Sequence, residues 1–198
     1  MKSLNTNSSD SGNGARLIVI SGPSGVGKDT VINSLKSYAI NWHFAITATT
    51  RNKRNTEVEG TDYYFMTRPE FMATLDKGEF FEYAQVYNNW YGVPKIPIED
   101  ALAKGKSVIL KVDVQGAKTL RALVPNGLFI FLMPPSIEDL RNRLIKRSSE
   151  STEELEIRLL KAVEEIKESE LFDYTVTNDD LTNVVRNIAT IINKETSR

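Results

Sequence analysis

A glycine-rich turn between an apolar run and a helix-like segment constrains the fold more than any other feature of the sequence. Residues 20–30 read ISGPSGVGKDT, with the spacing G-x-x-x-x-G-K over 22–28. The apolar run 17–20 before it is typical of a buried parallel strand. Inward-pointing N–H groups and a helix N-terminus attract a polyanion, and the lysine adds a full positive charge. The sequence therefore predicts a phosphate-binding loop formed by Gly22, Pro23, Ser24, Gly25, Val26, Gly27 and Lys28.

The residue after this lysine departs from the usual pattern. Asp29 stands where Ser or Thr usually supplies a neutral oxygen to magnesium. A carboxylate is also a hard oxygen ligand, but it brings negative charge beside the phosphates. Three roles are open for Asp29: a solvated bystander, a direct metal ligand, or a metal contact through water, which is the interpretation favoured here. Thr30 is an alternative source of the hydroxyl.

Composition excludes several classes of chemistry. The chain has 198 residues, no cysteine and one histidine, which rules out disulfides, thiolate sites and most zinc-hydrolase arrangements. The net charge of -1 gives no basic field for nucleic acid. The sequence contains neither an apolar run long enough to cross a membrane nor a signal-peptide pattern, so a cytoplasmic location is expected. Residues 1–14, rich in Ser, Asn and Gly, are expected to form a disordered leader.

The remaining pattern alternates strand and helix. Buried strands are expected at 107–113, 128–133 and 174–176, and helices at 28–38, 116–123, 136–147, 151–166 and 181–193. Ser136 with Asp139, and Ser151 with Glu154, resemble capping boxes. This alternation predicts an α/β fold with a mainly parallel sheet flanked by helices. The polar, aromatic segment 47–94 interrupts it and predicts a small mixed α/β lobe inserted into a core of residues 15–46 and 95–193.

Two arginines three residues apart mark the start of this lobe. Arg51 and Arg54, with nearby hydroxyls and Tyr63, suit a phosphate monoester, because guanidinium groups offer forked and permanently charged donors. A solvated basic turn is the alternative interpretation.

Several motifs in one order resemble those of bacterial guanylate kinases, members of the P-loop nucleoside monophosphate kinase superfamily. After the phosphate loop come T-x-T-T-R-x-x-R-x-x-E-x-x-G-x-D-Y-x-F from residue 47, F-x-E-Y-A from 80, Y-G at 91, V-D-x-Q-G from 112, P-P-S-x-E-D-L from 134 and N-D-D-L from 178. The resemblance covers residues from about 15 to about 193. It implies a P-loop NTPase core, a GMP-binding lobe, a helical lid at about 143–158, and magnesium-dependent transfer of the ATP γ-phosphoryl group to GMP.

The resemblance also implies a role for each matching residue. Glu82 would accept hydrogen bonds from guanine N1–H and the 2-amino group, which adenine does not present. The lysine and arginines around the transferring group would be Lys28, Arg51, Arg143, Arg147 and Arg158. ATP would contact the loop, Asp29, Thr30 and Asn178, and magnesium would be held mainly by phosphates and water near Asp29, Thr30 and Asp113. GMP would contact Thr47, Arg51, Arg54, Tyr63, Glu82, Tyr91 and Asp113.

Some of these roles have alternatives. Asp113 has three possible roles: it orients metal-bound water, contacts guanine or caps a helix. Asn178 has two possible roles: it borders the adenine of ATP or caps a loop. Val93 stands where the family often has Ser or Thr, and Lys111 where it often has an acidic residue. Valine cannot donate a hydrogen bond to guanine, a loss of about 0.5–1.5 kcal/mol.

The sequence leaves three alternatives to phosphoryl transfer. A guanylate-kinase-like interaction module, a P-loop kinase for another small substrate, and a nucleic-acid-binding protein are the alternatives. The intact phosphate loop disfavours the interaction module. Glu82 together with Arg51 and Tyr63 disfavours a kinase for another substrate, and the balanced charge disfavours a nucleic-acid-binding protein. The expected partners are therefore ATP and GMP, with neither nucleic acid nor membrane, in a monomer or a homodimer.

Overall fold

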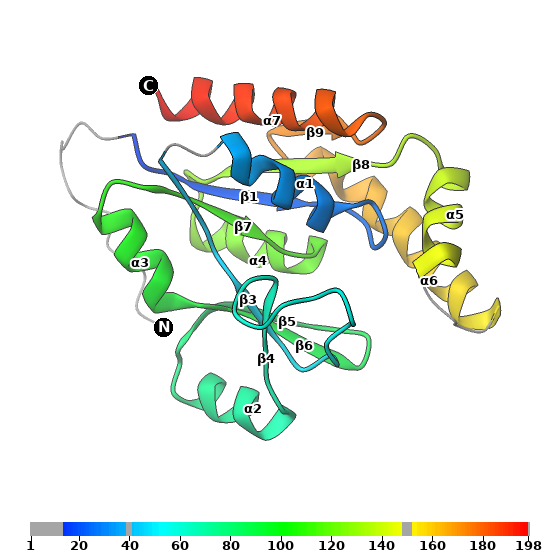
Figure 1. Ribbon diagram of the computed structural model, residues 1–198, viewed down its shortest axis with the longest axis horizontal. Helices are drawn as coiled ribbons and strands as arrows, with labels where there is room; N and C mark the ends of the chain where they lie inside the picture. Colours follow the sequence, from blue (N-terminus) through cyan, green and yellow to red (C-terminus); the bar gives the residue numbers. More distant parts are fainter. Residues whose placement is uncertain (1–13, 39–40, 148–151, 198) are drawn as a thin grey trace.

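The core of the protein is a parallel sheet of five strands in the order β2-β7-β1-β8-β9 (Figure 1). The computed structural model describes residues 14–38, 41–147 and 152–197. The predicted leader, apart from Gly14, therefore lies outside the described residues. The strands are β1 (Leu17–Ser21), β2 (Trp42–Phe44), β7 (Ser107–Lys111), β8 (Leu128–Met133) and β9 (Tyr174–Thr177). The parallel α/β architecture predicted from the sequence is confirmed.

Helices cover both faces of this sheet, and alternate residues of β1 point to each. Ile18 and Ile20 belong to the apolar cluster shared with α1 and α7, whereas Leu17 and Val19 belong to the cluster shared with α3 and α4. Complete burial on both faces explains why the strand is continuously apolar. The covering helices are α1 (Lys28–Leu35), α3 (Lys95–Ala103), α4 (Val114–Leu123) and α7 (Leu181–Thr196), and the short 3₁₀ turn η1 (Lys36–Tyr38) follows α1.

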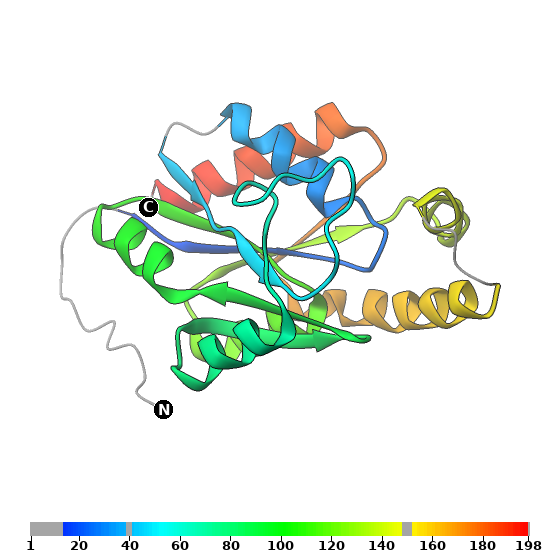
Figure 2. The ribbon, with the colours of Figure 1, turned by 60° about the horizontal axis from the view of Figure 1, so that its bottom comes forward.

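A second sheet lies below the carboxyl ends of the core strands (Figures 1 and 2). Its strand order is β4-β3-β6-β5, with β5 and β6 antiparallel. Phe71 of the single helix in this region stacks on Phe80 at 4.5 Å between ring centroids, and both are buried. The elements are β3 (Thr47–Thr49), β4 (Tyr63–Phe65), α2 (Arg68–Asp76), β5 (Phe80–Val86) and β6 (Asn89–Pro94).

Two further helices extend from the core beside the phosphate loop. These are α5 (Ile137–Arg147) and α6 (Thr152–Lys167), which is followed by the 3₁₀ turn η2 (Glu168–Leu171). They pack through a small cluster of Leu140, Leu144 and Ala162. The predicted cap before α5 is present, because Ser136 Oγ accepts a hydrogen bond from Asp139 N at 3.0 Å. The second predicted capping residue, Ser151, lies outside the described residues.

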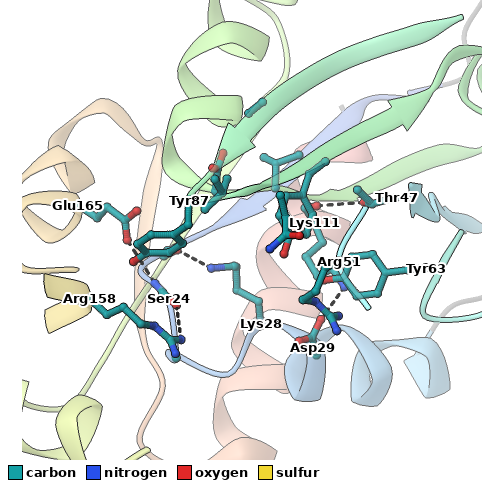
Figure 3. A pocket seen from close by; sticks show the side chains of 18 of the residues that line it. Ser24, Lys28, Asp29, Thr47, Arg51, Tyr63, Tyr87, Lys111, Arg158 and Glu165 are labelled. Carbon is teal, nitrogen blue, oxygen red and sulfur yellow. Dashed lines mark hydrogen bonds and ion pairs between the residues drawn. The ribbon is translucent and has the colours of Figure 1, made fainter. Parts of the chain in front are cut away.

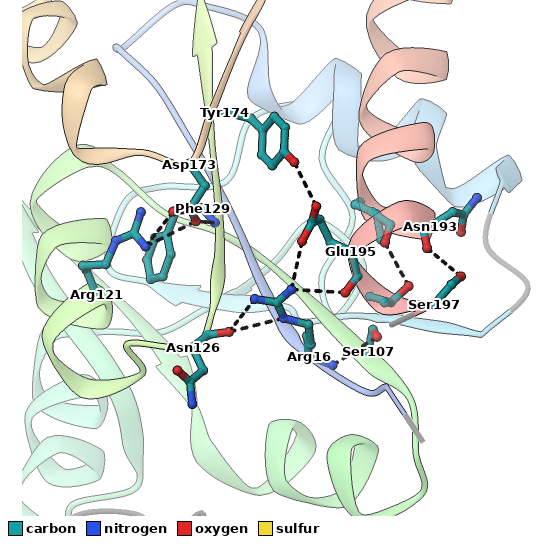
Figure 4. A network of polar contacts seen from close by, with 12 residues as sticks. Arg16, Ser107, Arg121, Asn126, Phe129, Asp173, Tyr174, Asn193, Glu195 and Ser197 are labelled. Carbon is teal, nitrogen blue, oxygen red and sulfur yellow. Dashed lines mark hydrogen bonds and ion pairs between the residues drawn. The ribbon is translucent and has the colours of Figure 1, made fainter. Parts of the chain in front are cut away.

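A polar network ties together the amino ends of the core strands, opposite the phosphate loop (Figure 4). Arg16, just before β1, donates to the carbonyl oxygens of Asn126 at 2.9 Å and Glu195 at 3.1 Å. Asp173, just before β9, accepts from Phe129 N of β8 at 2.8 Å. The carboxyl ends of the same strands are thus left for ligand binding. Within the described residues, no helix is long and apolar enough to cross a membrane.

Candidate active site

One cavity of about 570 Å³ lies at the carboxyl ends of β1 and β7 (Figure 3). In open α/β sheets this edge is where ligands bind. The walls come from the phosphate loop, the second sheet, the segment after β7 and helix α6. The predicted site residues that line the cavity are Gly22, Ser24, Gly25, Lys28, Asp29, Thr47, Arg51, Arg54, Tyr63, Glu82, Tyr91, Asp113 and Arg158.

The glycine-rich loop adopts backbone conformations that explain its glycines. Gly27 has φ of 102° and occupies the N-cap of α1. Gly22 has φ of 147°, and a Cβ there would lie 2.4 Å from the carbonyl oxygen of Leu132. Lys28 Nζ donates to the carbonyl oxygens of Gly22 at 2.6 Å and Pro23 at 3.1 Å. Burial lowers the pKa of Lys28 despite opposing effects of Glu165, Asp29 and Asp113.

Two predicted site residues support this loop from outside the cavity. Arg143 donates to the carbonyl oxygens of Val26 at 2.9 Å and Asn178 at 3.0 Å. Asn178 Nδ2 also donates to Val26 O, at 2.7 Å, which matches the loop-cap alternative. Thr30 is exposed and does not line the cavity either. Arg147 ends α5, and its side chain lies outside the described part of the structure.

Helix α6 reaches the same loop from the other side. Glu165 Oε2 accepts a hydrogen bond from Ser24 N at 3.2 Å, and Arg158 donates to Ser24 Oγ at 3.1 Å. Burial raises the pKa of Glu165, although Lys28 acts in the opposite direction. Glu165 was not among the residues predicted from the sequence. Its spacing of seven residues from Arg158, two turns on one helix face, was the signal that could have found it.

The arginine pair of the second sheet is held by a carboxylate. Arg51 makes a two-pronged ion pair with Glu57, at 2.7 Å and 3.1 Å. Glu57 also accepts from Arg54 N at 2.8 Å. The Arg51 guanidinium carbon lies 5.4 Å from the centroid of the Tyr63 ring. Glu57 was part of the sequence motif but was given no role, and the geometry makes it the residue that orients Arg51.

Glu82 is the buried acid of the site. Its side chain is 5% exposed, and Oε1 has no hydrogen-bond partner within the described residues. Burial, with a further contribution from the Asp113 carboxylate, raises the pKa of Glu82 to about 8. Gly116 permits this placement, because a Cβ there would lie 2.8 Å from Glu82 Oε1. A buried acceptor without a partner is prepared for a ligand that brings donors.

Asp113 and Val93, both singled out by the sequence, are neighbours of Glu82. Asp113 Oδ1 accepts a hydrogen bond from Gly116 N at 2.7 Å, so Asp113 caps α4. The helix cap was one of its three predicted roles. The same residue lines the cavity, so its contact with a ligand stays a prediction. Val93 pairs with Glu82 across the sheet, is 1% exposed and packs in the apolar cluster of Leu17 and Ile98.

The two charged departures from the family pattern meet in the cavity wall. Lys111 Nζ lies 2.5 Å from Asp29 Oδ1 and 4.1 Å from the centroid of the Tyr63 ring. This ion pair shows that Asp29 is engaged by a lysine, and its role toward magnesium stays a prediction. Among the described residues, no group of three or more His, Cys, Asp or Glu side chains could hold a metal ion.

Comparisons with known proteins place the chain beside guanylate kinases. The family description "Guanylate kinase" matches residues 14–195. The guanylate kinase of Clostridioides difficile (strain 630) is 42% identical over 92% of this chain and 89% of its own length. The guanylate kinase of Clostridium tetani is 44% identical over 92% of this chain and 87% of its own length. The crystal structure of guanylate kinase from Anaplasma phagocytophilum is 35% identical, covers 93% of this chain and 87% of that chain, and superposes with a TM-score of 0.78.

Proposed function

Because the chain belongs to the guanylate kinase family, we propose that this cavity is where it transfers the γ-phosphoryl group of ATP to GMP, giving ADP and GDP. The chain is thus an ATP:GMP phosphotransferase. One observation carries the assignment of the cavity: the phosphate loop lines the same space as the buried Glu82 carboxyl, whose Oε1 has no hydrogen-bond partner among the described residues.

Glu82 selects guanine in this proposal. Its carboxylate accepts hydrogen bonds from N1–H and the 2-amino group, a pair of donors that adenine lacks. Burial supports this role, because an unpaired donor or acceptor in a dry site is costly and a wrong base would leave one. Arg51, Arg54 and Tyr63 bind the phosphate of GMP, and Thr47 and Tyr91 position the same nucleotide.

The loop binds the phosphates of ATP, and Lys28 then exchanges the loop carbonyls for phosphate oxygens. An oxygen of the GMP phosphate attacks the γ-phosphorus, and the bond to the β-phosphate oxygen breaks. This reaction requires positioning and neutralisation of charge more than a protein nucleophile. Arg51 and Arg158 supply cations from opposite walls, while Arg143 acts by holding the loop. Arg147 is proposed to add a further positive charge from the lid.

Magnesium enters this proposal with ATP. The two carboxylates predicted to lie near magnesium, Asp29 and Asp113, are engaged by Lys111 and by the α4 cap, which supports contact with the ion through water. The side chains present therefore fit an ion held mainly by phosphates. When bound, magnesium neutralises phosphate charge. The cytoplasm is the proposed location, where these nucleotide substrates are found.

Closure of the lobe (47–94) and of the lid (143–158) onto the core is part of the same proposal. Lys28, Arg51 and Arg158 repel one another when no phosphate lies between them. Bound substrates remove that repulsion, and closure excludes water that would hydrolyse ATP. Solution scattering without compaction in the presence of both nucleotides would contradict closure.

The experiment measures ADP formation from ATP and magnesium with GMP, AMP, CMP and UMP in parallel. Turnover is expected with GMP alone and is expected to fall about a hundredfold in Glu82→Gln. Glu79→Gln, an exposed carboxyl on the same lobe, is the matched control and keeps the wild-type rate. Equal turnover with AMP, or none with any nucleotide despite ATP binding, would refute the proposal.

A further inference from the structure

Lys111 and Asp29 are 82 residues apart in the sequence and form one ion pair in the site. The register of the sheet places them together, because Lys111, the last residue of β7, lies opposite Ile20, the residue of β1 that precedes the loop by two positions. Asp29 lies in the first turn of α1. Guanylate kinases usually have a hydroxyl residue at position 29 and often an acidic residue at position 111, so both charged residues depart from that pattern.

The surroundings of Lys111 keep it charged and directed into the cavity. Its side chain is 14% exposed and lines the cavity, with the Asp29 carboxylate beside it and the Tyr63 ring against it. Burial by itself lowers the pKa of Lys111, but Tyr63 and Asp29 together raise it above the ordinary value. An ammonium group has three donors, and Asp29 and the Tyr63 hydroxyl together engage fewer than three.

The position of Lys111 is between the two groups of phosphate-binding side chains. On one side are Lys28 and the loop, and on the other are Tyr63 and Arg51 (Figure 3). An ammonium there attracts a phosphate that approaches from the lobe side. Repulsion between Asp29 and such a phosphate is reduced by the same ion pair.

We propose that Lys111 is a further phosphate-binding residue, whose ammonium contacts the phosphate of GMP, and that Asp29 is the positioning residue that holds it there. This inference rests on the proposed function of the cavity. It differs from a purely structural ion pair in one respect. If Lys111 only neutralised Asp29, removal of both charges would restore the site, whereas a phosphate contact is lost in every variant without the ammonium.

The test is a double-variant cycle of Lys111→Met, Asp29→Asn and the two together. Affinity for GMP is measured by calorimetry without ATP, and KM for each nucleotide by steady-state kinetics. We expect Lys111→Met to weaken the affinity for GMP about ten- to a hundredfold, which is the effect of losing a charged hydrogen bond. KM for ATP should be nearly unchanged. Asp29→Asn is expected to weaken the affinity for GMP about threefold to tenfold. The double variant should be as defective as Lys111→Met.

Controls separate this contact from a loss of folding. Lys118→Met removes a lysine that pairs with Glu168 away from the cavity, and should leave GMP affinity unchanged. Lys111→Gln keeps a polar head group, and melting temperatures of all variants identify any that are unfolded. Lys111→Arg keeps the charge and should therefore bind GMP more tightly than Lys111→Met or Lys111→Gln.

The outcomes distinguish the two proposals. Wild-type GMP affinity in the double variant, or in folded Lys111→Met or Lys111→Gln, overturns the inference. Wild-type protein that binds GMP without phosphorylating it, and loses that affinity in Lys111→Met, overturns the proposed function and supports the phosphate contact.

Discussion

The raised pKa of Glu82 predicts that GMP binding releases a proton from the protein. Guanine donates two hydrogen bonds, so the bound form of Glu82 must be the carboxylate. With a pKa of about 8, caused by burial and by Asp113, about 0.9 of the free protein carries this proton at pH 7. Release of about 0.9 proton per GMP is therefore expected from wild type at pH 7. The apparent GMP affinity should rise about 50-fold between pH 6 and pH 8, because the ionised fraction grows from about 1% to about half.

Calorimetry in buffers of different ionisation enthalpy measures the proton release directly. Glu82→Gln has no proton to release from this position, so the difference between wild type and variant isolates the carboxyl. The phosphate of GMP titrates similarly in both proteins and cancels in that difference. Equal proton release from wild type and variant at pH 7 would refute the reasoning.

The same carboxyl affects folding stability with a defined sign. A pKa raised from 4.5 to about 8 means that the folded state holds the proton more tightly. The associated stability is fully present below about pH 4.5 and is lost as pH rises through about 8. Wild type should therefore lose a few kcal/mol relative to Glu82→Gln between about pH 5 and pH 9. Urea unfolding of both proteins at both pH values measures this difference. The same change in unfolding free energy with pH in wild type and in Glu82→Gln would contradict it.

Three further outcomes follow from the geometry of the lobe. Gly116→Ala places a Cβ against the Glu82 carboxyl and should raise KM for GMP about tenfold with KM for ATP unchanged, whereas equal changes in both would contradict the steric argument. Glu57→Gln removes the charge that orients Arg51 and should raise KM for GMP about fivefold in steady-state assays, and an unchanged value would mean that Arg51 does not need this support. Phe71→Ala should lower the free energy of unfolding in urea by about 3–5 kcal/mol, and a loss below about 1 kcal/mol would show that the lobe core repacks.

Features encoded by neighbouring residues could be predicted from the sequence. The loop and its flanking strand and helix are one local unit, specified by an apolar run, glycines and helical spacing. Two elements of the core, β2 and α3, were not predicted, for local reasons. β2 is a three-residue edge strand, Trp42–Phe44, too short for a pattern. Helix α3 has Pro97 in its first turn and no side-chain cap, so it lacks the usual start signal.

Contacts between distant residues could not be predicted in this way. Asp29 and Lys111 were recognised as separate departures, but their ion pair depends on the register of β1 with β7. Glu165 likewise becomes part of the site only when α6 packs beside the loop. The burial that raises the pKa of Glu82 is also a property of the assembled lobe and core.

The position of β1 in the sheet also determines when the phosphate loop can form on the ribosome. Both neighbours of β1 come late, since Leu17 pairs with Val108 and Ile18 with Leu128. At about 5–20 residues per second, translation leaves the first strand unpaired for roughly 5–20 seconds. A nascent chain stalled before residue 107 should therefore expose this apolar strand to chaperones and remain unable to retain ATP.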